Sequence, residues 1–170
     1  MDLWHNVKRF FGSLRPGPPP REDLSWAEGH LLPAEVDLWR VMSNPDKRHA
    51  LRVAHRVEAA LGPDAPRPVM AAALLHDVGK VDAHLRTYGR VIATLTIWLA
   101  GKRTVASWTQ TRGLWRRLGL YAEYTRLGSE ALALAGSDPL TVAWALEHHE
   151  PPEAWTIPRE LGEVLAAADE

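Results

Sequence analysis

Apolar residues return every three or four positions along most of this chain. The segment 45–61 shows the pattern clearly, because Leu51, Val53 and Val57 fall on one face and Gly62-Pro63 follows the last apolar position. The same spacing predicts helices over residues 35–42, 69–78, 85–99, 104–118, 120–135, 140–149 and 158–169. The strict alternation between hairpin turns that is typical of strands is absent from the sequence. The pattern therefore predicts an all-α fold, a helical bundle.

Two of these helices have recognisable start signals. Asn44-Pro45-Asp46 supplies a capping side chain and then a proline at the first helical position, where the missing N–H is no loss. Gly136-Ser137-Asp138-Pro139 ends one helix and opens the next in the same manner. We therefore expect Asn44 to cap the helix that begins near residue 45.

The first 33 residues differ from the remainder. Residues 1–14 have the pattern of a short amphipathic helix, and the run Arg15-Pro16-Gly17-Pro18-Pro19-Pro20 stops it and favours an extended linker. We expect residues 1–33 to form an N-terminal arm that packs on a helical domain of residues 34–170. The alternative is an anchor for a membrane surface or a partner, for which a single weakly charged helix gives less support.

Composition and charge narrow the possible functions. Hydrophobic residues make up 46% of the 170, charged residues 24%, and the formal charge is -1, so no global field favours nucleic acid as a partner. The longest apolar stretch, residues 91–101, is too short to span a bilayer as a helix, so we expect no transmembrane segment. The absence of cysteine fits a cytoplasmic protein and leaves His, Asp and Glu as the available metal ligands.

Four such residues lie on three predicted helices of one core. His49 shares a helix face with Val53 and Val57, while His76 and Asp77 stand at the end of the apolar run that begins at Val69. Asp169 ends the last apolar helix. Singly, each is more often a core histidine or a solvated carboxylate. Together, two imidazoles and two carboxylates suit one divalent ion: Mn, Fe, Co, Ni, Zn or Mg.

The sequence resembles the HD superfamily of metal-dependent phosphohydrolases. The resemblance rests on Arg48-His49, on the run from Ala72 to Lys80 that contains His76-Asp77-Val78-Gly79-Lys80, and on the residues before Asp169. It implies an HD-domain-like helical bundle over most of the chain, with His49, His76, Asp77 and Asp169 holding one metal. His55 competes with His49 for the first position, and the preceding arginine favours His49.

Glu147-His148-His149-Glu150 is similar to a segment of HD-superfamily branches that bind two or three metals. Those branches, including the HD-GYP cyclic dinucleotide phosphodiesterases, also carry a histidine where this sequence has Tyr124, before Leu127-Gly128. The Gly-Tyr-Pro element of the HD-GYP branch is absent as well. We therefore expect a mononuclear site, with His148 and His149 lining the substrate pocket. The alternative is that both histidines stand at a helix C-terminus only because the helix dipole favours imidazolium there.

Among the charged residues, Asp77 is expected to be catalytic, orienting a water as well as ligating the metal. Lys80, one helical turn further on, is the second catalytic candidate and is placed to meet a substrate phosphate, and Arg48 offers a bidentate guanidinium for the same purpose. The basic residues between 102 and 117 are better explained as a solvated helix face than as a substrate entrance.

We therefore expect a hydrolase of a nucleotide or another small phosphate ester, with that phosphorylated compound as its partner. A ligand-binding or regulatory module that keeps the fold and has little turnover is the alternative, because Tyr124 replaces a histidine. A helical adaptor with an anchoring N-terminal helix is the third possibility, supported by residues 1–20 alone.

Overall fold

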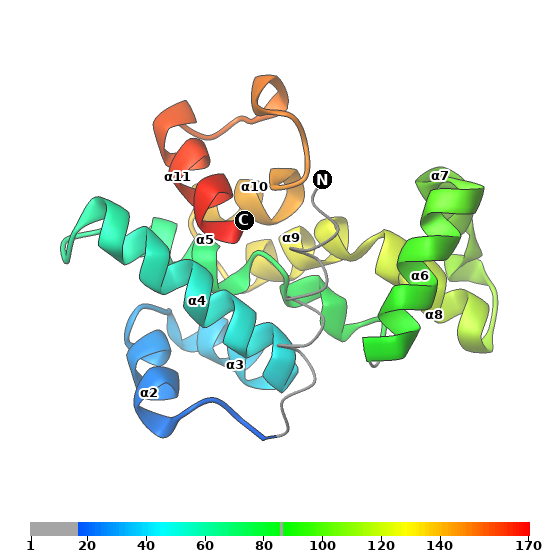
Figure 1. Cartoon of the computed structure of the whole chain (residues 1–170), viewed down its shortest axis with the longest axis horizontal. Coiled ribbons are helices and arrows are strands. Elements are labelled where there is room, and N and C mark those ends of the chain that lie inside the picture. Colours follow the sequence, from blue (N-terminus) through cyan, green and yellow to red (C-terminus); the bar gives the residue numbers. More distant parts are fainter. Residues whose placement is uncertain (1–16, 86) are drawn as a thin grey trace.

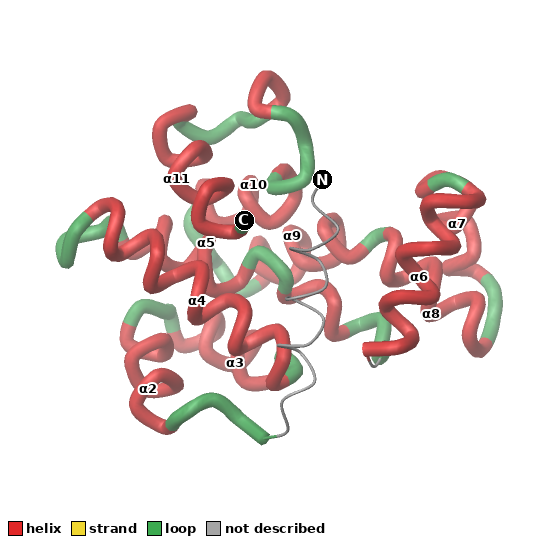
Figure 2. The backbone as a smooth tube through the Cα atoms, viewed as in Figure 1, coloured by secondary structure: helices red, strands yellow, loops and turns green. Residues whose placement is uncertain are grey.

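The computed structural model describes residues 17–85 and 87–170, and this part of the chain consists of helices and loops without a strand (Figures 1 and 2). The α-helices are α2 (Arg21–Gly29), α3 (Pro33–Val41), α4 (Asn44–Leu61), α5 (Arg67–Leu75), α6 (Thr87–Ala100), α7 (Lys102–Ala106), α8 (Gly113–Ala122), α9 (Tyr124–Leu134), α10 (Pro139–Glu147) and α11 (Arg159–Asp169). Short 3-10 helices are η1 (Val78–Val81), η2 (Ser107–Gln110) and η3 (Pro152–Ala154). The predicted all-α fold is confirmed.

Helix α5 forms the centre of the main body. Every side chain from Val69 to Leu75 is fully buried, because this helix is apolar on all faces and is covered by α3, α4, α10 and α11. Figure 1 shows these helices gathered around α5. The α-helix ends at Leu75, and the next three residues, His76, Asp77 and Val78, are still buried.

Capping explains where two helices begin. Ser43, and not Asn44 as expected, caps α4: its hydroxyl accepts from the Asp46 N–H at 3.4 Å, and Asn44 is already helical. The expectation for Asn44 was wrong because Ser43 offers an equivalent acceptor one residue earlier. Asp138 caps α10, with its carboxylate accepting from the Leu140 N–H at 2.9 Å.

A second, smaller lobe is built from α6, α7, η2 and α8 and lies at the far end of the molecule from α2 and α11 (Figure 1). It has a core of its own, formed by the residues Ala83, Leu85, Ala93, Val105, Leu118 and Ala122. The single helix predicted over 104–118 is divided here, since Gly113 has a φ of 63° and Gly119 packs against the backbone of Thr109. The helix predicted over 120–135 is likewise divided at Glu123.

The domain extends further toward the N-terminus than residue 34. Helix α2 packs on the core through fully buried Ala27, and the Trp26 ring stacks on His55 with centroids 4.0 Å apart. Part of the expected arm is therefore a helix of the domain. The amphipathic helix predicted over residues 1–14 lies outside the described residues. None of the described helices combines the length and the apolar character needed to cross a bilayer.

Candidate metal centre

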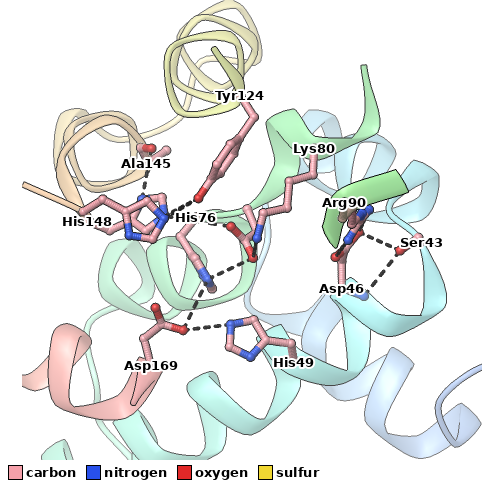
Figure 3. Close-up of polar contacts among 12 residues, drawn as sticks. Ser43, Asp46, His49, His76, Lys80, Arg90, Tyr124, Ala145, His148 and Asp169 are labelled. Carbon is pink, nitrogen blue, oxygen red and sulfur yellow. Dashed lines mark hydrogen bonds and ion pairs between the residues drawn. The ribbon is translucent and has the colours of Figure 1, made fainter. Parts of the chain in front are cut away.

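The predicted ligands come together where three helices of the core meet. His49 projects from the second turn of α4, His76 is the C-cap of α5, and Asp169 ends α11 (Figure 3). Neighbouring side chains within a helix point in different directions. Asp77 follows His76 after the helix has ended, so these two side chains can face the same space. Because the helix ends here, an adjacent histidine and aspartate can both direct their side chains toward one ion.

The distances between ligand atoms suit a single small cation. His49 Nε2 lies 2.8 Å from Asp169 Oδ1, and His76 Nε2 lies 3.5 Å from Asp77 Oδ2 and 3.8 Å from Asp169 Oδ1. Ligand atoms at about 2.1 Å from one ion are at most about 4.2 Å apart. One ligand atom each from His49, His76 and Asp77 lies within 4.8 Å of the other two, a wider bound than this limit.

The protonation of His76 points in the same direction. Its Nδ1 lies 3.0 Å from the Ala73 carbonyl oxygen, which only accepts, so Nδ1 carries a proton. In the neutral ring, Nε2 is then a bare lone pair. This nitrogen is buried, has no hydrogen-bond donor among the described residues, and faces the carboxylates of Asp77 and Asp169. A cation placed among these atoms resolves the repulsion between them, and the donor set fits a divalent metal.

Gly79 brings a further helix to the cluster. A Cβ at residue 79 would lie 1.9 Å from the Tyr124 carbonyl oxygen and 2.6 Å from the Gly128 backbone nitrogen, which no side chain tolerates. Glycine therefore lets η1 cross α9 backbone against backbone, with Gly128 as its counterpart on α9. This crossing sets Tyr124 and Lys80 beside the ligands (Figure 3).

Lys80 binds Asp77 directly. Its Nζ lies 2.5 Å from Asp77 Oδ2 and 4.9 Å from the centre of the Tyr124 ring. The side chain is only 16% exposed, so the ammonium and the carboxylate form a largely buried pair. Lys80 therefore lies beside the predicted ligands in the structure. Its contact with a substrate phosphate stays a prediction.

Tyr124 links the two histidines of the Glu147-His148-His149-Glu150 segment to this pair. Its hydroxyl contacts His149 Nε2 and lies 3.3 Å from His148 Nε2. His148 Nδ1 donates to the Trp144 and Ala145 carbonyl oxygens, both at 3.2 Å, so Nε2 of the neutral ring is again a lone pair. It faces Asp77 Oδ1 at 3.8 Å. His148 therefore lines the cluster with an acceptor atom, and the exposed His149 lies at its edge.

The electrostatics favour ionised carboxylates at Asp77 and Asp169 and the neutral form of His49 and His148. Burial opposes ionisation of Asp77, but the charges of Lys80 and the nearby histidines outweigh it and hold its pKa well below the usual range. Burial also opposes ionisation of Asp169, but the hydrogen bond from His49 outweighs burial, so the pKa of Asp169 is lowered. Burial lowers the pKa of His49, and burial together with the neighbouring His76 lowers that of His148 to about 3. Two carboxylates against one ammonium leave the cluster with a net attraction for cations.

Asp169 is held in place although it stands near the end of the sequence. Leu165 and Ala168 of α11 are buried against the core, and Arg56 of α4 donates from Nη1 to the Ala168 carbonyl oxygen at 2.9 Å. The Asp169 side chain is 22% exposed, more than the 2% of His76. Solvent therefore reaches the cluster from the side of Asp169.

The two histidines of α4 have different surroundings. His49 contacts Asp169, whereas His55 lies under Trp26 and 3.9 Å from Glu58. Arg48 donates from Nη1 to the Gly17 carbonyl oxygen at 2.5 Å, a contact with the segment before α2. A role for Arg48 in substrate binding stays a prediction.

Two features of the site were not predicted from the sequence. Tyr124 stands out there only as the residue in place of a histidine, and its contacts with His148 and His149 depend on the crossing of η1 and α9. Asp46, one turn before His49, accepts a bidentate hydrogen bond from Arg90 of α6, with Nη2 2.7 Å from Oδ2 (Figure 3). The only available signal was a carboxylate at a buried helical position, because a pair spanning two lobes leaves no local pattern.

The comparisons with known proteins add no relative. No protein-family model matches the chain, and neither a curated protein nor a solved structure matches it.

Proposed function

We propose that this protein is a metal-dependent phosphohydrolase acting on a nucleotide or another small phosphate ester. The observation that carries the proposal is the buried Nε2 of His76, which meets no donor and faces two carboxylates. The resemblance of His76-Asp77-Val78-Gly79-Lys80 to the HD superfamily supplies the reaction class. The same resemblance and the lack of cysteine support the cytoplasmic location that the sequence predicts.

His49, His76, Asp77 and Asp169 would hold one divalent ion, chosen among Mn, Fe, Co, Ni, Zn and Mg. Such an ion acts as a Lewis acid toward a phosphoryl oxygen and toward water. Mixed imidazole and carboxylate ligands suit the transition metals in this series, while the two carboxylates also admit Mg.

The other residues have separate tasks in this proposal. Lys80 fixes Asp77 by holding Oδ2 at 2.5 Å, and Oδ1 of the same carboxylate faces His148 Nε2 at 3.8 Å. Both facing atoms accept hydrogen bonds, so they would orient an attacking water by its two protons. His148, with a pKa of about 3, acts there as an acceptor of a hydrogen bond and not as a base at neutral pH. Lys80 and Arg48 would supply positive charge to the substrate phosphate.

A hydrolysis screen tests the proposal, and α4 offers a matched pair of variants. Purified protein loaded with Mn, Co, Ni, Zn or Mg is assayed for phosphate release from nucleotides and small phosphate esters. We expect at least one metal to support turnover, His49→Gln to remove it, and His55→Gln to preserve it, since His55 stacks on Trp26 outside the cluster. Metal binding without turnover on any of these substrates would favour the ligand-binding module, to which Tyr124 in place of a histidine points.

A further inference from the structure

The lobe of α6, α7, η2 and α8 leaves one face of α6 apolar and uncovered. The exposed fractions of its apolar side chains are Val91 41%, Ile92 49%, Leu95 54%, Trp98 80% and Leu99 75%. At 3.6 residues per turn these five positions fall within an arc of about 120°. Ala93 and Ile97 lie on the opposite side of α6 and pack into the lobe core. We call the five exposed residues the α6 stripe.

The polar residues that border the α6 stripe are already satisfied. The hydroxyl of Thr94 donates to the Arg90 carbonyl oxygen at 3.0 Å, and that of Thr96 donates to the Ile92 carbonyl oxygen at 2.7 Å. Threonine hydroxyls bonded back to their own helix need no water. The stripe can therefore enter an apolar environment without losing hydrogen bonds.

The charge of the lobe identifies what such a surface would meet. Six basic residues and no acidic one lie between residues 87 and 122, whereas the whole chain has 21 acidic residues. One of the six, Arg90, is turned to Asp46. The other five are exposed: Lys102, Arg103, Arg112, Arg116 and Arg117. Helices that lie in the interface of an anionic membrane typically combine an exposed apolar face with nearby basic residues.

We propose that the α6 stripe and the basic residues of this lobe dock the protein on an anionic bilayer surface. Helix α6 has 14 residues and is about 21 Å long, which fits an interfacial orientation and not a crossing. In this arrangement Trp98 and Leu99 enter the headgroup boundary, and the lysine and arginines meet lipid phosphates. The inference is independent of the hydrolase proposal, because no residue of the stripe belongs to the metal cluster.

Two other occupants fit the observations less well. A second copy of the lobe would bring like charges together without a carboxylate to offset them. Nucleic acid would meet the basic residues, but Val91, Ile92 and Leu95 gain nothing from a phosphate backbone. Of the three partners, the lipid surface alone would interact favourably with both the α6 stripe and the basic residues.

Vesicle co-sedimentation of the full chain tests the docking. We expect binding to vesicles of three parts phosphatidylcholine to one part phosphatidylglycerol, and at least about tenfold weaker binding to phosphatidylcholine alone. The double variant Trp98→Ser/Leu99→Ser should weaken binding about tenfold or more. Leu134→Ser is the matched control, since Leu134 of α9 is 90% exposed and lies outside the lobe.

A second pair of variants separates charge placement from net charge. Arg116→Gln/Arg117→Gln should weaken binding to the anionic vesicles about tenfold or more, and Arg40→Gln/Arg159→Gln, with the same change in net charge, should leave it unchanged. No binding to anionic vesicles, or equal binding of Trp98→Ser/Leu99→Ser and Leu134→Ser, overturns the proposal. So does a lipid-free dimer that Trp98→Ser/Leu99→Ser dissociates, or duplex DNA binding by a protein that ignores the vesicles.

Discussion

His49 Nε2 and Asp169 Oδ1 lie 2.8 Å apart, and this contact joins α4 to the last turn of α11. It closes the cluster around His76, whose Nε2 is buried among acceptors. The donor-free Nε2 of His76 and the two ionised carboxylates form a cluster that one bound cation would stabilise. The stability of the fold and the binding of that cation are therefore linked, and each can be tested through named residues.

The crossing of η1 and α9 should depend on the absence of a side chain at Gly79. Gly79→Ala places a Cβ 1.9 Å from the Tyr124 carbonyl oxygen, so we expect a loss of about 3 kcal/mol or more in unfolding free energy. For a chain of this size the loss corresponds to about 6 °C or more in melting temperature. Gly29→Ala is the control, because nothing lies within 4 Å of its added Cβ. Equal melting temperatures for the two variants would refute the crossing.

The pair of Asp46 and Arg90 should stabilise the contact between the two lobes. The side chains are only 7% and 20% exposed, and Arg90→Met leaves a buried carboxylate without its guanidinium. We expect a loss of about 2 kcal/mol or more in denaturant unfolding. Arg126→Met removes exposed contacts with Glu123 and Glu130 and should cost less than about 1 kcal/mol. A loss for Arg90→Met no larger than for Arg126→Met would contradict a stabilising role.

The metal-free protein should lose stability as the pH falls below about 6.5. The pKa of His148 is lowered to about 3 in the fold, so between these values the unfolded chain binds a proton that the folded chain does not. The unfolding free energy should fall by about 1.4 kcal/mol per pH unit for this group, with His49 acting in the same direction. Urea unfolding at pH 7, 6, 5 and 4 measures the slope, which His148→Gln should reduce. A variant slope equal to that of the unmodified chain would show that His148 is not responsible.

Replacing Lys80 should tighten divalent metal binding. The ammonium lies 2.5 Å from Asp77 Oδ2 and competes with a metal for that oxygen. In Lys80→Met this competition is removed and the net negative charge of the cluster rises, so calorimetric titration with Mn should give a lower Kd. The variant should at the same time hydrolyse substrate more slowly, since it has lost the positive charge that we propose meets the substrate phosphate. Loss of metal binding in Lys80→Met would mean that Lys80 is needed to build the site.

Local patterns in the sequence brought His76, Asp77 and Asp169 into one cluster because each stands at or just after the end of a helix with buried apolar residues, whereas His49 lies in the second turn of the polar α4. His76-Asp77 follows the fully buried α5, and Asp169 follows Leu165 and Ala168, so burial alone brings their ends together. Helix α2 was missed because it is mostly polar, with Ala27 as its one buried residue. The break before α8 was missed because it depends on the positive φ of Gly113 and on the close approach of Gly119 to Thr109, which spacing does not predict. Tyr124 and Arg90 reach the site by contacts across the chain that no spacing predicts.

The measurement that tests the central claim most directly is the metal content of the purified protein after loading with Mn, Co, Ni or Zn and exhaustive desalting. We expect one ion per chain in the unmodified protein and in His55→Gln, and none in His49→Gln, with the helix content of all three unchanged by circular dichroism. A protein that retains no ion, or a His49→Gln variant that retains as much as His55→Gln, would contradict a metal centre formed by His49, His76, Asp77 and Asp169.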